Sequence, residues 1–121
     1  MDVRLREGIN LFNQGRFFES HEALEQFYRE TEDVHKSFLE GLIQLAAAFR
    51  LYTDFAEVKG PVRMIYQALI RFENYQPSYL GIRTEELSAS MEAWAKEAET
   101  ASGKLSSSVP KIRLQGFHFF R

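Results

Sequence analysis

Three neighbouring residues, His21, Glu22 and Glu25, have side chains that can hold a metal ion or move a proton. On a helix, positions 21 and 25 lie on the same side, because residues four apart are neighbours. Such a pair suits two ligands of a metal ion, or an imidazole that a carboxylate orients for acid–base chemistry. The spacing differs from the H-E-x-x-H zinc signature, because Glu25 stands where that signature has its second histidine. A catalytic zinc usually has three protein ligands, and this pair supplies only two.

A structural role for His21 competes with the chemical one. His21 falls in an apolar stripe between Phe17 and Leu24, so its imidazole is expected to be buried or half-buried. A buried imidazole needs a hydrogen-bond partner, and Glu25 or Gln44 would supply one. We favour this structural interpretation, because buried polar groups commonly serve to fix one packing arrangement.

Gln44 and Glu40 are the polar residues of the next candidate helix. They are one helical turn apart in an otherwise apolar stretch. They would either line a small pocket together with His21 and Glu22, or pair with backbone groups and buried water. The candidate polar cluster therefore consists of His21, Glu22, Glu25, Gln44 and Glu40, with any bound metal or cofactor unknown.

Helices must position these residues, because apolar side chains recur every three or four positions along most of the chain. The pattern predicts five helices, at about residues 5–13, 16–31, 34–53, 61–75 and 84–101. Gly15 is expected to end the first helix in a left-handed conformation, and Thr84 to cap the fifth. The third helix is apolar on two sides, which is typical of a central helix.

The pattern changes after residue 101. Ser and Gly predominate first, and apolar and polar residues then alternate in Ile112-Arg113-Leu114-Gln115 and in Phe117-His118-Phe119. Alternation favours an extended segment. We therefore expect a helical domain over residues 1–101, and a linker with a C-terminal arm over residues 102–121. The arm is expected to dock on its own helices or on a partner.

Composition excludes some classes of function and argues against others. The 121 residues carry a net charge of −2, whereas proteins that bind nucleic acids usually have a basic excess. The chain has no cysteine, which excludes disulfides and thiolate chemistry. No apolar run approaches the length of a membrane span, and charged residues occupy the N-terminus where a signal peptide would be apolar. The expected location is the cytoplasm.

Two blocks of sequence are similar to a known family. Residues 17–25 read FFESHEALE and residues 38–48 read FLEGLIQLAAA. Together with the fourth helix they resemble the small prokaryotic family catalogued as domain of unknown function 309, over roughly residues 5–80. The resemblance implies a compact multihelical bundle and no particular activity. Members often carry Trp where this chain has Tyr28, and many carry His near Leu51, so a site that used that histidine would be incomplete here.

These observations predict an all-α fold, a compact multihelical bundle of about five helices with an extended C-terminal arm. The favoured function is a non-catalytic module that binds a protein partner or associates with itself as a homo-oligomer, because so many aromatic residues and an apolar C-terminal arm are hard to bury in a small bundle. The alternative is a small metal-dependent hydrolase-like enzyme that uses His21, Glu22 and Glu25. A third class, nucleic-acid binding, rests only on basic residues of the arm, namely Lys104, Lys111, Arg113 and Arg121.

Overall fold

The computed structural model describes residues 1–101, 105 and 108–116 of the chain. Within this part the chain forms five α-helices and two short 3₁₀ helices, which confirms the predicted all-α fold. No helix of the described part is long and apolar enough to cross a membrane. The elements, in chain order, are α1 (Val3–Asn13), α2 (Phe17–Glu30), η1 (Asp33–His35), α3 (Lys36–Phe55), α4 (Lys59–Phe72), η2 (Glu73–Tyr75) and α5 (Thr84–Thr100).

Local chemistry explains both ends of α1, whereas the start of α5 differs from the prediction. Asp2 caps α1 by accepting the backbone N–H of Arg4 at 2.8 Å. Gly15 has a φ of +80°, so the prediction of a left-handed residue after the first helix is confirmed. The prediction that Thr84 caps the fifth helix is wrong. Thr84 is the first residue of α5 and is fully buried, and its hydroxyl donates to the Tyr75 carbonyl instead.

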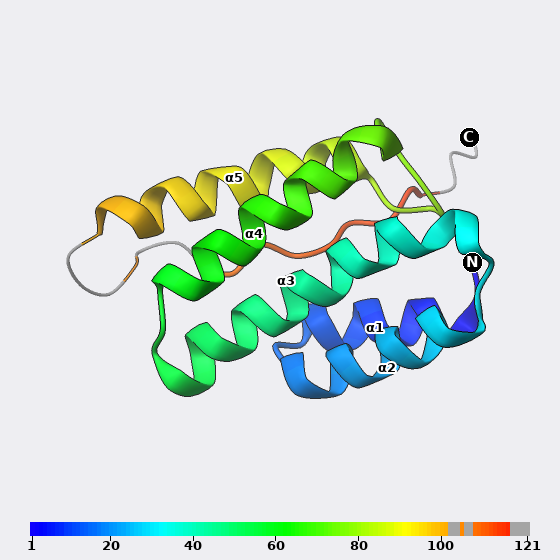
Figure 1. Ribbon diagram of the computed structural model, residues 1–121, viewed down its shortest axis with the longest axis horizontal. Helices are drawn as coiled ribbons and strands as arrows, with labels where there is room; N and C mark the ends of the chain where they lie inside the picture. Colours follow the sequence, from blue (N-terminus) through cyan, green and yellow to red (C-terminus); the bar gives the residue numbers. More distant parts are fainter. Residues whose placement is uncertain (102–104, 106–107, 117–121) are drawn as a thin grey trace.

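The helices are arranged as successive antiparallel neighbours around α3 (Figure 1). The hairpin of α1 and α2 lies on one side of α3, while α4 and α5 lie on the other. Residues on both sides of α3 have no exposed surface: Phe38, Leu42, Leu45 and Phe49 on one side, and Leu39 and Ala46 on the other. The prediction that the third helix is central is therefore confirmed.

Aromatic rings fill the centre of the bundle. The ring of Phe12 lies 5.0 Å from that of Phe17 and 5.8 Å from that of Phe49, edge to face in both pairs. Trp94 of α5 packs edge-on against Phe49, with a centroid distance of 4.9 Å. These rings join α1, α2, α3 and α5 in one core, so the aromatic surplus is largely accommodated within a single chain.

The described part of the C-terminal arm packs on the helices of its own chain. Asn13 holds the backbone of Ile112 from both sides, with its amide donating to the carbonyl at 2.9 Å and its oxygen accepting the N–H at 2.8 Å. Gln115 donates to the Gly81 carbonyl at 2.7 Å, and Ile112 is 2% exposed. Of the two docking alternatives, the structure shows the first for residues 108–116. The expected alternation at residues 117–119 lies outside the described residues.

Candidate functional site

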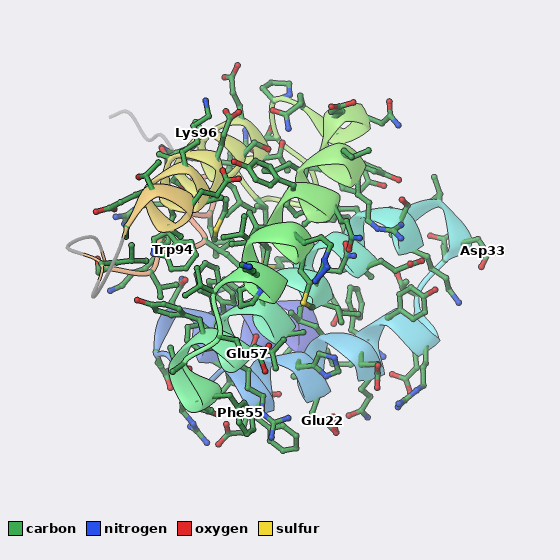
Figure 2. All side chains as sticks on the ribbon, turned by 60° about the vertical axis from the view of Figure 1, so that its left-hand side comes forward. Glu22, Asp33, Phe55, Glu57, Trp94 and Lys96 are labelled. Carbon is green, nitrogen blue, oxygen red and sulfur yellow. The ribbon has the colours of Figure 1, made fainter. Side chains whose placement is uncertain are left out.

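His21, Glu22 and Glu25 lie together on α2, with one ligand atom from each side chain within 4.8 Å of the others. His21 Nδ1 is 3.7 Å from a carboxylate oxygen of Glu22. The His21 side chain is 29% exposed, so the imidazole is half-buried rather than enclosed in the core. Glu22 points outward at the lower edge of the molecule (Figure 2). The three side chains are thus open to solvent and accessible to an ion.

The rotation of α2 about its axis explains this placement. Phe17, Ser20 and Leu24 are buried and face the core. The Ser20 hydroxyl donates to the Gly8 carbonyl of α1 at 2.8 Å, which fixes α2 against α1. His21 follows Ser20 directly, so it falls at the edge of the buried stripe. This position accounts for its half-buried imidazole.

The cluster needs an adjustment before it can hold a metal ion. Nitrogen and oxygen ligands lie about 2.1 Å from zinc in a tetrahedral site, which places them about 3.4 Å from one another. The present spread is larger, so the side chains would have to close in. Arg29 also competes for the site, because it forms an ion pair with Glu25 at 3.0 Å. A divalent ion would have to share that carboxylate or displace the guanidinium.

Arg71 of α4 engages Glu40 and Gln44 instead of leaving them free for His21. Its guanidinium lies 3.1 Å from Glu40 and donates to the Gln44 side-chain oxygen at 3.2 Å. Gln44 in turn donates to Gln67 at 3.2 Å. The Tyr28 hydroxyl donates to Glu40 at 3.1 Å, and this hydrogen bond to a carboxylate raises the pKa of Tyr28. The two residues therefore belong to a network that links α2, α3 and α4.

The candidate polar residues thus fall into two adjacent groups. His21 and Glu22 lie in the first group only, and Glu25 belongs to both. Beside the second group lies an open pocket of about 460 Å³, whose lining residues are Glu25, Tyr28, Arg29, Glu40, Ile43 and Gln44. A pocket does lie at Gln44, as in the first of the two alternatives for this residue, but His21 and Glu22 are not among the residues that line it.

Two polar contacts were missed by the sequence reasoning. Arg71 is not among the candidate residues of the sequence analysis, because nothing in its local sequence shows that it reaches across to α3. His35 follows two acidic residues in the sequence, and its Nε2 lies 4.0 Å from Glu32. The shortest contact of His35, however, joins its Nδ1 to the Tyr79 hydroxyl at 2.6 Å. Tyr79 lies in the loop between η2 and α5, and the sequence does not indicate that this loop lies beside His35.

An open groove between α4 and α5, with a volume of about 940 Å³, is the larger surface feature. Its apolar residues include Ile70, which is 64% exposed, and Val58, which is 39% exposed. The Tyr66 hydroxyl donates to Glu99 at 2.7 Å across the groove, and this hydrogen bond raises the pKa of Tyr66. The residues that line the groove are Val58, Lys59, Val62, Arg63, Tyr66, Gln67, Ile70, Ala98, Glu99 and Ala101.

Comparison with known families matches residues 5–63 to the family described as Domain of unknown function (DUF309). The comparison with curated proteins found no match. The family match spans α1, α2, α3 and the start of α4, so it contains the candidate polar cluster but only the first part of the groove. It ends before the residue 80 to which the resemblance was expected to run. The match over residues 5–63 confirms the resemblance to the DUF309 family that the two sequence blocks had indicated.

Proposed function

We propose that this domain acts by binding a protein through the groove between α4 and α5 and that it does not catalyse a reaction itself. The observation that carries this proposal is the exposure of Ile70 and Val58 beside one large open groove. Apolar surface that is gathered at a groove, rather than scattered, is typical of an interaction site. The proposal includes a cytoplasmic location, with which the absence of cysteine is compatible.

The sequence-based hypothesis of an interaction module rested on the aromatic residues and the arm, whereas the present proposal rests on the groove. Most of the large rings lie in the core, and Ile112 of the arm is covered by its own chain. The groove is different, because Val62 of α4 and Ala98 of α5 form a nearly buried floor while Ile70 of α4 stands out beside it. A partner that covers Ile70 would gain about 25 cal/mol for each Å² of apolar surface removed from water.

Site-specific photocrosslinking in the native host tests this function. Benzoylphenylalanine in place of Ile70 is expected to give discrete protein adducts that mass spectrometry identifies. The matched control carries the same group in place of Val3, which is 79% exposed on α1 and far from the groove. Equal adducts from both positions, or none from position 70, would refute the proposal.

Metal binding at His21, Glu22 and Glu25 is a second candidate, favoured by the proximity of their three ligand atoms. Three protein ligands would leave a fourth position for water, which is the arrangement that a hydrolase-like activity requires. The alternative of a small metal-dependent enzyme rests on this arrangement.

Calorimetric titration with Zn²⁺ tests this second candidate. One ion is expected to bind per chain, and the His21→Ala variant is expected to lose that binding at unchanged fold. The His35→Ala variant is the control, because His35 belongs to a different contact, with Tyr79. Binding that persists in His21→Ala, or no binding to the unaltered chain, would contradict the metal site.

A further inference from the structure

We infer that the partner that occupies the groove is the same groove of a second copy of this chain, so that α4 of each copy packs against α5 of the other. This inference rests on the proposed function and adds the identity of the partner. The two copies would be related by a twofold axis that runs parallel to the helices, which produces a four-helix bundle at the interface.

Opposite charges on the two walls of the groove support this arrangement. On the α4 wall, the charged residues that line the groove are Lys59 and Arg63, both basic. On the α5 wall, the charged residue that lines the groove is Glu99. A surface with one basic and one acidic wall is complementary to itself when a second copy reverses the order of the walls.

The groove also offers cations that lack a partner within the chain. Arg71 is occupied by Glu40, at 3.1 Å. Lys59 and Arg63, by contrast, line the groove and form no ion pair with any residue of the described part. Both are exposed, as is Glu99 on the opposite wall. A second copy would bring its own Glu99 to these cations.

The choice of symmetry axis follows from these charges. The middle of α4 is level with the end of α5, because Tyr66 bonds to Glu99, and the beginning of α4 lies at the same end of the molecule as the end of α5 (Figure 1). A twofold axis parallel to the helices leaves each residue at the same height along the helices and places α4 of one copy opposite α5 of the other. Lys59 and Arg63 then lie opposite the partner's Glu99. An axis across the helices would instead place α4 on α4 and α5 on α5, with like charges facing each other.

The available area sets the strength of the association. The 14 residues of α4 span about 21 Å, and two helices side by side are about 20 Å wide, which gives a face of about 400 Å² per copy. Stable interfaces bury about 800 Å² per partner. The dimer is therefore expected to be reversible, with a dissociation constant on the order of micromolar or weaker.

Sedimentation analysis of the purified chain, from about 1 µM to about 1 mM, tests the inference. We expect a monomer–dimer equilibrium that Ile70→Glu weakens at least tenfold and that the matched control Val3→Glu leaves unchanged. Circular dichroism and thermal melting confirm that each variant folds. A chain that stays monomeric up to about 1 mM overturns the inference, as does a dimer that Ile70→Glu leaves intact.

Charge reversal tests the arrangement of the helices. Lys59→Glu/Arg63→Glu is expected to weaken the dimer at least tenfold, and Glu99→Lys is expected to weaken it as well. The variant that combines all three changes is expected to restore the dimer, because basic and acidic walls again face each other. A combined variant as weak as its parents overturns the α4-to-α5 arrangement.

The two proposals fail in different ways. A monomeric chain whose position 70 still crosslinks to another protein refutes the second copy as the partner and leaves the interaction function standing. Absence of any adduct from position 70 in the host refutes the interaction function itself.

Discussion

Replacing Gly41 with alanine tests whether the backbones of α3 and α4 approach each other closely. This close packing sets the position of α4, and therefore of Arg71 and the groove. Gly41 is buried in the middle of α3. A Cβ atom at this position would lie 2.5 Å from Cε1 and 3.0 Å from Cζ of Phe72 on α4. Real Cβ contacts do not come this close, so either the ring or the helix must move.

The magnitude follows from two opposing effects. Overpacking a core costs about 1–3 kcal/mol, whereas replacing glycine by alanine within a helix gains about 1 kcal/mol. The Phe72 ring is fully buried and lies 5.4 Å from the ring of Phe38, so it cannot swing aside freely. We therefore expect Gly41→Ala to lose about 1–2 kcal/mol of stability, or about 4–8 °C in Tm for a domain of this size.

Thermal melting followed by circular dichroism measures this change, with Gly60→Ala as the matched control. Gly60 lies in the first turn of α4, where a Cβ would meet only a Glu57 carboxylate oxygen, at 3.4 Å. Gly60→Ala is expected to be neutral or to gain up to about 0.5 kcal/mol. If Gly41→Ala melts at or above the temperature of the unaltered chain, the close approach of α3 and α4 is refuted.

Three further predictions concern individual hydrogen bonds. Asn13→Ala removes both bonds to the Ile112 backbone, so trypsin is expected to cleave the C-terminal segment faster than in the unaltered chain, and equal rates would contradict the docking of the arm. Ser20→Ala is expected to lose about 1–2 kcal/mol in urea unfolding, because a buried carbonyl of α1 loses its side-chain donor; a loss below about 0.3 kcal/mol would mean that this bond does not anchor α2. Glu99→Gln is expected to lower the pKa of Tyr66 toward its ordinary value of about 10, because the neutral amide no longer disfavours the phenolate. Ultraviolet titration against Tyr66→Phe measures this shift, and an unchanged curve would show that the carboxylate does not act on the phenol.

The sequence by itself determined the helices and the central place of α3. Their apolar spacing is a local property, since burial of one helical face requires side chains at every third or fourth position. The left-handed Gly15 was also predictable, because glycine takes that conformation without a steric cost. The same spacing placed His21 beside Glu22 and Glu25, which are neighbours on any helix formed by these residues.

Only the tertiary structure decided which polar residues of different helices meet. Arg71 reaches Glu40 and Gln44 because α4 packs closely on α3, and the periodicity of one helix contains no information about the rotation of another. Thr84 shows the same limit, since it has the residue type of a cap but lies buried beside the Tyr75 carbonyl. The groove also depends on two helices at once: its basic and acidic walls come from separate segments, and only their packing side by side creates the surface between them.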